Sequence, residues 1–199
     1  MNPMTITKTD RTDFELQMFW VYCICVAGKN ADYASRVVGK MLSQRPQEQS
    51  PFDYLTTEGE VALRNRLVAH KVGQYTRITR AIWESRELNL RECTHRMLEE
   101  IYGVGPKTAR FFILHSRRDA LVAVLDTHIL RWLREVHGLD GIPLQTPQDR
   151  AHYHRVEIVA LRMMRLDFPG VPLAEADMMI WSVMSGRSDG GDFGFGNVS

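Results

Sequence analysis

The sequence predicts an all-α fold of two helical lobes, and three observations lead to this prediction. Apolar residues recur every three to four positions along most of the 199-residue chain, which is the spacing of one buried helix face. The chain contains no strand-rich segment, internal repeat or coiled-coil pattern. Glycine and proline residues separate the periodic segments, at places where they end one helix and begin the next.

The first half of the chain is expected to contain a buried apolar helix and further helical segments. Residues 14–27 are almost wholly apolar from Met18 onward and are too long for one strand, so they predict a buried central helix. A break at 28–30 follows. Helical spacing then returns over 32–42, 57–70 and 74–86. A polar, proline-containing loop over 44–50 follows the first of these segments.

The middle of the chain predicts a helix, a glycine turn and a second helix. The first helix is short and covers 90–101, and Pro106 fits the first turn of the second, which continues to Ser116. An aliphatic link over 119–125 leads to Asp126, which suits the N-cap position of the next helix. The remaining helices are expected over 127–136, 152–166 and 173–184.

The composition excludes several classes of protein. No apolar run approaches the roughly 18 residues that cross a bilayer, and the N-terminus lacks the order of a secretory signal. We therefore expect an intracellular protein of the cytoplasm or nucleoid, without membrane contact. The cysteines, Cys23, Cys25 and Cys93, form no paired framework and are too few for the four thiolates of an iron–sulfur cluster. Cys23 and Cys25 are expected to fill the core.

The net charge is +1, but the charges are unevenly distributed. Residues 64–134 hold 14 Lys and Arg against 7 Asp and Glu, whereas the rest of the chain carries a net charge of −6. This segment predicts a basic face for phosphate groups, although solvated helix surfaces would account for many of the arginines individually.

The most informative motif is the run Ile101-Tyr102-Gly103-Val104-Gly105-Pro106-Lys107-Thr108-Ala109, followed by Val124-Leu125-Asp126-Thr127-His128-Ile129. A glycine turn that opens a helix presents N–H groups to a phosphate. Lys107 lies in that first turn, and Asp126 follows nineteen positions later. A phosphate site with an amine and a carboxylate nearby predicts an enzyme that acts on nucleic acid.

These motifs resemble those of the helix-hairpin-helix (HhH-GPD) DNA glycosylase superfamily, and the resemblance extends from about Phe14 to Trp181. Among its members the chain is most similar to the archaeal type of 8-oxoguanine DNA glycosylase/AP lyase, without an iron–sulfur cluster. It departs from the usual pattern at Ile101-Tyr102, where the family has Leu-Pro, and it keeps both glycines of the turn.

The resemblance implies a single catalytic unit over 1–185, with a DNA-binding groove between two helical lobes. The middle lobe covers about 32–130 and contains the hairpin. The N-terminal helix and the C-terminal helices form the other lobe. Residues 186–199, which are rich in glycine, are expected to form a flexible tail.

A lysine at the place of Lys107 marks the bifunctional members of the superfamily, which remove a base and then nick the strand. The resemblance implies that the Lys107 amine attacks the sugar, expels the base and leaves an imine, which permits β-elimination. Asp126 is implied to stay ionised and to stabilise the positive charge on the sugar. Alternatively, Lys107 is only an exposed lysine of the helix and Asp126 is only a helix cap.

The resemblance also implies the contacts to the DNA backbone. The hairpin residues expected at one phosphate are Gly103, Val104, Gly105 and Thr108. No cofactor is required, and a monovalent cation on the carbonyl side of the hairpin is an optional ligand. The wedge that fills the gap left by a flipped base is expected to be Lys29 or Asn30, with an ordinary interhelical turn as the alternative.

The base pocket is expected to combine residues of two helices. Phe111 lies one turn beyond Lys107, whereas Asp177 and Trp181 lie four residues apart near the end of the chain. The resemblance implies that the two rings sandwich the flipped base and that Asp177 accepts hydrogen bonds from guanine, which presents two donors. Gln17 is a further polar candidate. Alternatively, both rings belong to the core and Asp177 pairs locally.

The histidines carry no expected chemistry. The resemblance implies packing or helix support for His128, and His152 and His154 diverge on a helix, so no metal site is expected. The predicted function is excision of 8-oxoguanine from double-stranded DNA by a monomeric glycosylase/AP lyase. Two alternatives stay open: the same chemistry on oxidised or hypermodified pyrimidines, and a non-catalytic hairpin module that only grips DNA.

Overall fold

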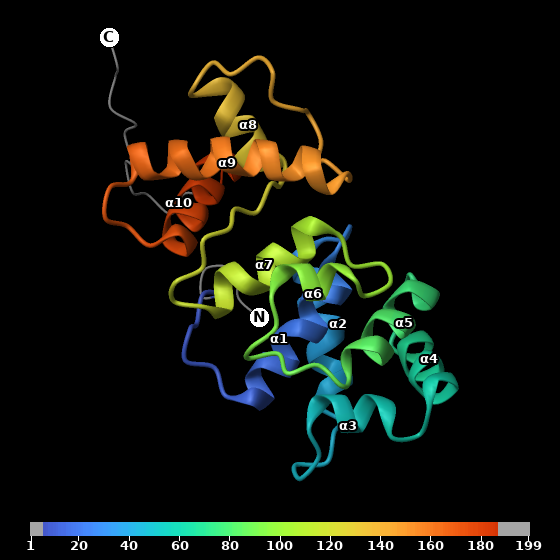
Figure 1. Ribbon diagram of the computed structural model, residues 1–199. Helices are drawn as coiled ribbons and strands as arrows, with labels where there is room; N and C mark the ends of the chain where they lie inside the picture. The colour runs from blue at the N-terminus through green and yellow to red at the C-terminus, as the bar shows by residue number, and fades with distance from the viewer. Residues whose placement is uncertain (1–5, 187–199) are drawn as a thin grey trace. The chain divides into compact units, whose positions relative to one another are not determined.

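The computed structural model describes residues 6–186, and this part of the chain is helical, with no strand (Figure 1). The all-α prediction is therefore confirmed. All but Gly186 of the expected tail lies outside the described residues. The helices are α1 (Asp13–Val26), α2 (Ala31–Leu42), α3 (Pro51–Thr56), α4 (Glu60–Ala69), α5 (Tyr75–Ser85), α6 (His95–Glu99), α7 (Pro106–Ser116), α8 (Thr127–Glu135), α9 (Arg150–Asp167) and α10 (Leu173–Ser185).

The chain divides into two compact units, Met1–Arg117 and Arg118–Ser199. The first contains α1 to α7, and the second contains α8 to α10. The lobe boundaries expected from the sequence stay a prediction. None of the described helices combines the length and the apolar composition that a membrane span needs.

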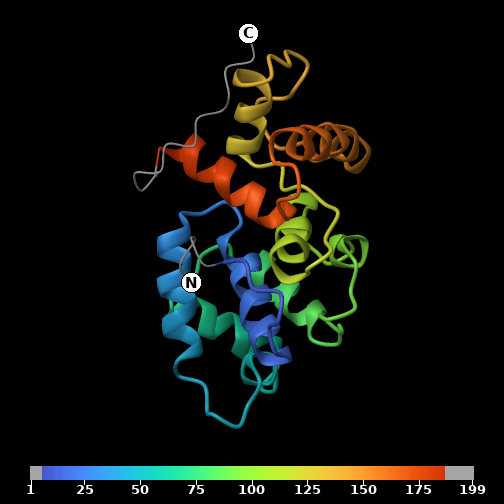
Figure 2. The same ribbon diagram turned by 90° about the vertical axis from the view of Figure 1, so that its left-hand side faces the viewer.

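Helix α1 is buried at the centre of the N-terminal unit, and the sequence predicts a buried helix at these residues. Each residue from Phe19 to Cys25 is buried, and the helix packs against α2, α3, α5 and α7 (Figures 1 and 2). A capping box fixes its start, because the Glu15 N–H donates to the Thr12 hydroxyl and the Thr12 N–H donates to the Glu15 carboxylate. This apolar helix supplies the core on which the other helices of the unit are arranged.

The cysteines are part of this core. All three thiols are free and buried, and burial raises the pKa of Cys25 to about 12. A buried thiol that resists ionisation is unreactive. The packing role expected for Cys23 and Cys25 is confirmed.

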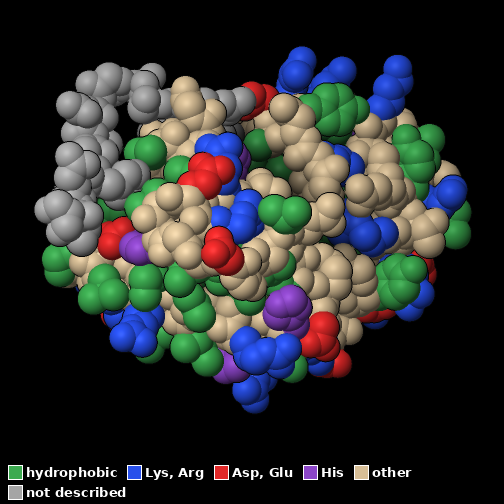
Figure 3. All heavy atoms as spheres, turned by 90° about the horizontal axis from the view of Figure 1, so that it is seen from above, with side chains coloured by type: hydrophobic (Ala, Val, Ile, Leu, Met, Phe, Trp, Pro, Cys, Tyr) green, Lys and Arg blue, Asp and Glu red, His purple; other side chains and the backbone are tan. Residues whose placement is uncertain are grey.

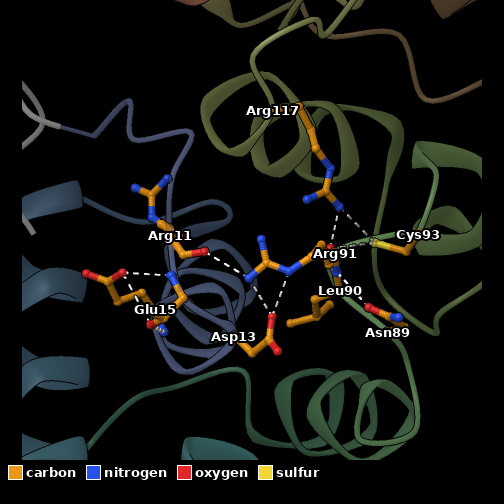
Figure 4. Close-up of polar contacts among 9 residues, drawn as sticks. Arg11, Asp13, Glu15, Asn89, Leu90, Arg91, Cys93 and Arg117 are labelled. Carbon is orange, nitrogen blue, oxygen red and sulfur yellow. Dashed lines mark hydrogen bonds and ion pairs between the residues drawn. The ribbon is translucent and has the colours of Figure 1, made fainter.

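The loop before α6 is tied to the start of α1 by Arg91 (Figure 4). Its guanidinium donates to the Asp13 carboxylate at 2.6 Å and to the Arg11 carbonyl at 3.0 Å. The helix expected over 90–101 is shorter in the structure, where α6 covers His95–Glu99. It begins late because Thr94 is its N-cap and accepts a hydrogen bond from the Met97 N–H. The residues before Thr94 form a turn instead.

Helix α3 is an element that the sequence analysis did not predict. Ser50 caps it by accepting from the Asp53 N–H at 3.1 Å, and Pro51 occupies its first turn. This is a recognisable start signal. The helix is only six residues long, too short to show helical periodicity.

The C-terminal unit is a three-helix arrangement around an apolar cluster. Helix α10 packs against both α8 and α9 and runs across α9 at a large angle (Figures 1 and 2). The largest buried side chains of the cluster are Trp132 and Tyr153, from α8 and α9. Asp126 precedes α8, so the position of this residue depends on the packing of that core.

Helices α6 and α7 are joined by a buried ion pair between Glu99 and Arg110. Both side chains are about 95% buried, with 4% and 5% of their surfaces exposed. Loss of one member of such a pair leaves the other charge buried without full compensation. The pair therefore fixes how the two hairpin helices pack together.

We expect Glu99→Gln to lower the free energy of unfolding by about 3 kcal/mol or more. Urea unfolding followed by circular dichroism measures this change. The matched control is Glu92→Gln, since Glu92 is exposed and pairs with no cation among residues 6–186. Equal effects of the two substitutions would contradict the role assigned to the pair.

Candidate active site

The turn between α6 and α7 requires glycine at position 103. Gly103 has a φ of +73°, and a Cβ added there would lie 2.3 Å from the Cγ atom of Arg77. The Arg77 guanidinium donates to the Gly103 carbonyl at 3.1 Å and to the Ile24 carbonyl at 2.8 Å. Arg77 thus joins the hairpin turn to the end of α1. This contact has no local sequence signal, because Arg77 lies 26 residues from the turn.

Tyr102, the departure from the family pattern, packs on the surface of the turn. Its backbone N–H donates to the Glu84 carboxylate at 2.7 Å, and the Arg80 guanidinium lies 3.8 Å from the centre of its ring. Both partners come from α5. The residue changes how the turn is supported and leaves the glycine conformation in place.

Several N–H groups of the turn are open to a ligand. The Val104 N–H donates to the Ile101 carbonyl at 3.1 Å and is therefore used internally. The N–H groups of Gly105, Lys107 and Thr108 have no acceptor among the described residues. Gly105 also offers no side-chain cap to α7. Open N–H groups at the positive end of a helix favour a bound anion.

Lys107 is exposed in the first turn of α7, and no ion pair holds it within residues 6–186. Phe111 follows one turn later on the same helix, as the sequence predicts. Its half-buried ring contacts His115 edge-on at 4.7 Å and lies 6.0 Å from the ring of Phe19. The amine is therefore available for chemistry, with an aromatic surface beside it on the helix.

In the C-terminal unit, Asp126 is the N-cap of α8, as predicted. Its Oδ1 atom accepts from the N–H groups of His128 at 2.8 Å and Ile129 at 2.9 Å. The other carboxylate oxygen has no hydrogen-bond partner in the described part of the chain. One oxygen orients the side chain, which leaves the second available for another charge.

Helix α10 carries the two C-terminal candidates for the base pocket. Asp177 is buried, with 6% of its surface exposed, and Trp181 is half-buried one turn later. The Trp181 ring lies 6.1 Å from that of His128, in an edge contact. This contact fits the packing role expected for His128, and it brings Trp181 to the start of α8.

Of the remaining candidates, two already make local hydrogen bonds and the third buries its amine. The Gln17 side-chain oxygen accepts from the Phe52 N–H at 3.1 Å, at the start of α3. The Asn30 side chain caps α2 by accepting from the Tyr33 N–H at 3.0 Å. The Lys29 amine is buried without a hydrogen-bond partner among the described residues, and this burial lowers the pKa of Lys29. The roles proposed for these three residues stay predictions.

The described residues form no metal cluster, and the face drawn in Figure 3 carries charges of both signs. No three His, Cys, Asp or Glu side chains within residues 6–186 are grouped as metal ligands. On the face drawn in Figure 3, Lys and Arg side chains are interspersed with acidic ones. Any contact with phosphates on that face therefore depends on individual side chains.

The arrangement of the helices is shared with solved structures of DNA glycosylases. No family model matches the chain, but solved structures do. The 8-oxoguanine glycosylase/lyase of Methanocaldococcus jannaschii, in complex with 15mer DNA containing 8-oxoguanine, matches with a TM-score of 0.67 and 23% identity over 89% of this chain and 84% of that one. A second structure of the M. jannaschii enzyme matches with a TM-score of 0.65 and 22% identity, over 89% of this chain and 81% of that one.

The 8-oxoguanine DNA glycosylase of Thermotoga maritima has the same fold. Its TM-score is 0.67 and its identity 21%, over 89% of this chain and 83% of that one. At this level of identity the three structures establish the fold. The chemistry has to be argued from the residues of this chain.

We expect Gly103→Ala to destabilise the protein by at least about 1 kcal/mol, because the alanine would have to adopt a positive φ against the Arg77 side chain. Gly39→Ala in α2 is the control, since nothing lies within 4 Å of its added Cβ. This control should gain up to about 1 kcal/mol, because alanine is the better helix former. Thermal unfolding of both variants measures the two changes, and a tolerated Gly103→Ala would refute the tight turn.

Proposed function

We propose that this protein is a bifunctional DNA glycosylase and AP lyase that excises 8-oxoguanine. The observation that carries the proposal is the unpaired Lys107 in the first turn of α7, next to open N–H groups. The fold supports it, because the M. jannaschii neighbour bears the same activity in its name and was crystallised with DNA containing this base. The open N–H groups would receive one phosphate of the damaged strand.

Lys107 is the proposed nucleophile. Its neutral amine forms a bond to C1′ of the deoxyribose while the glycosidic bond breaks, and the base leaves with the bonding electrons and takes up a proton. The sugar opens and an imine forms between C1′ and the lysine. Loss of a proton from C2′ then expels the 3′ phosphate.

Asp126 is the proposed stabiliser of the positive charge that develops on the sugar. Its Oδ1 atom is occupied by the N–H groups of α8, so the side chain has little freedom to turn. The second oxygen is proposed to face the sugar and to relay a proton from Lys107. A carboxylate held in advance needs no reorganisation when the charge appears.

We propose that Phe111 and Trp181 stack on the two faces of the flipped base. Asp177 would accept hydrogen bonds from the N1–H and the N2 amine of that base. Gln17 would add a contact through its amide nitrogen, because its oxygen already accepts from the Phe52 N–H. Lys29 or Asn30 is the proposed wedge. Use of Asn30 would require it to leave the start of α2.

The proposed catalysis needs no cofactor, because the amine performs the chemistry. A monovalent cation fits the hairpin as an optional ligand, since the Val104 carbonyl accepts no hydrogen bond among the described residues. The Gly103 carbonyl is shared with Arg77. The proposed partner is double-stranded DNA with a damaged base, bound by a monomer inside the cell.

We expect Lys107→Gln to abolish the covalent adduct that borohydride traps between the protein and a duplex with one 8-oxoguanine, because an amide cannot form an imine. Gel electrophoresis measures the adduct. Lys71→Gln is the control for loss of one exposed positive charge, and it should trap normally.

A panel of single-lesion duplexes in the same assay separates the alternatives. Trapping with an oxidised pyrimidine but not with 8-oxoguanine would show that the protein excises another base by the same chemistry. Salt-sensitive binding without an adduct on any lesion would instead indicate a hairpin module that only grips DNA.

We expect Asp126→Asn to slow base release by at least about 100-fold, the usual effect of removing one stabilising group from a transition state. Asparagine is as good an N-cap as aspartate, so the melting temperature should stay close to that of the wild type. Single-turnover release of 8-oxoguanine at saturating protein measures the rate. A wild-type rate in this variant would remove Asp126 from the mechanism.

A further inference from the structure

The segment that leads into Asp126 has no secondary structure, yet residues 122–125 are buried. Buried N–H and C=O groups require hydrogen-bond partners. A strand would find them in a neighbouring strand and a helix within itself. This segment has neither possibility among the described residues, so its partners have to be side chains.

Those side chains come mainly from α9. The Tyr153 hydroxyl accepts from the Leu125 N–H at 2.8 Å and donates to the Ala123 carbonyl at 3.0 Å. The Glu157 carboxylate accepts from the Ala123 N–H at 3.1 Å. Thr146, in the loop before α9, donates to the Leu125 carbonyl at 2.7 Å. The backbone N–H and C=O groups of Ala123 and Leu125 therefore all have hydrogen-bond partners.

The Tyr153 hydroxyl is the centre of this network, because it bonds both residues at once. Tyr153 is fully buried, and Glu157 lies one turn further along α9 with 4% of its surface exposed. A buried hydroxyl that accepts one bond and donates another is held in one orientation. The backbone on both sides of it is held in one conformation.

The network ends where the candidate carboxylate begins. Asp126 directly follows Leu125, and its N–H donates to the Val124 carbonyl at 2.8 Å. The chain thus passes from the residues bound by Tyr153 into the N-cap within one residue. A shift of the Leu125 backbone would move the Asp126 carboxylate with it.

We propose that Tyr153 is a positioning residue for Asp126, supported by Glu157 and Thr146. The inference rests on the proposed function, in which the Asp126 carboxylate has to meet the charge on the sugar. Placement errors of about 1 Å at such a group cost about 100-fold in rate. Tyr153 itself touches no substrate in this proposal and acts only through the backbone that it binds.

The test is Tyr153→Phe, which keeps the buried ring and removes the hydroxyl. We expect single-turnover release of 8-oxoguanine to fall about 10- to 100-fold, while the dissociation constant for the duplex stays that of the wild type. In the Asp126→Asn background the same substitution should have little further effect, because the carboxylate that it positions is already gone. Additive losses in the double variant would overturn the proposal.

Tyr33→Phe is the matched control, since the Tyr33 hydroxyl also donates to a backbone carbonyl, that of Lys71, at 2.8 Å. It should leave the release rate unchanged. Thr146→Val is the second test variant and removes one bond to Leu125 from the half-buried loop side. It should lower the rate in the same manner but less, and it covers the case in which Tyr153→Phe fails to fold.

Hydrogen exchange provides a readout that does not depend on activity. In Tyr153→Phe the amides of Leu125, His128 and Ile129 should exchange faster, whereas that of Ala109 in α7 should not. Unchanged exchange at Leu125 and His128 would overturn the positioning role, even if the rate fell. If the wild type releases no base and the exchange result still holds, the proposed function fails while the support of Asp126 stands.

Discussion

The first N–H groups of a helix need acceptors, and both candidate catalytic residues lie at the start of a helix. Helix α7 begins at Gly105 and Pro106 without a side-chain cap, so its open N–H groups are available to a ligand. Helix α8 is capped by a carboxylate that keeps one oxygen unused. Among the other described helices, α4, α5 and α10 have no side-chain cap, whereas the rest are capped by Thr12, Asn30, Ser50, Thr94 and Asp149.

The Lys107 amine belongs to the same first turn of α7 as these open N–H groups. Phosphate at the open N–H groups would bring the sugar to the same end of the helix. The buried ion pair between Glu99 and Arg110 holds α6 against α7, and this restricts the turn that joins the two helices. A rigid turn fixes the distance between phosphate and amine.

Much of the fold could be predicted from the sequence, because it depends on periodic apolar residues and on local start signals. The buried central helix, the Asp126 cap and the placement of Lys107 and Phe111 on one helix are local properties, and the structure has them. The hairpin helix α6 is shorter than expected because Thr94 intervenes as a cap. Helix α3 was not predicted, because a helix of six residues is too short to show helical periodicity.

The candidate site was less predictable, because its supports come from distant parts of the chain. Lys29 and Gln17 illustrate this limit: their spacing gives no hint that the first buries its amine or that the second binds the start of α3. The same holds for Arg77, whose aliphatic carbons leave no room for a Cβ at position 103. Nothing in the amino-acid pattern identifies which backbone carbonyl a remote side chain will bind.

Arg77 and Tyr153 share one physical role, although they belong to different units of the chain. Each is a long side chain on a helix that binds the backbone next to a candidate catalytic element, the hairpin turn in one case and the Asp126 segment in the other. Turns and links without secondary structure have no ladder of their own to hold them. Side-chain to backbone hydrogen bonds replace that ladder, and they do so at a single geometry. An irregular backbone can therefore carry residues for chemistry as firmly as a helix does, provided that a buried side chain satisfies its polar groups.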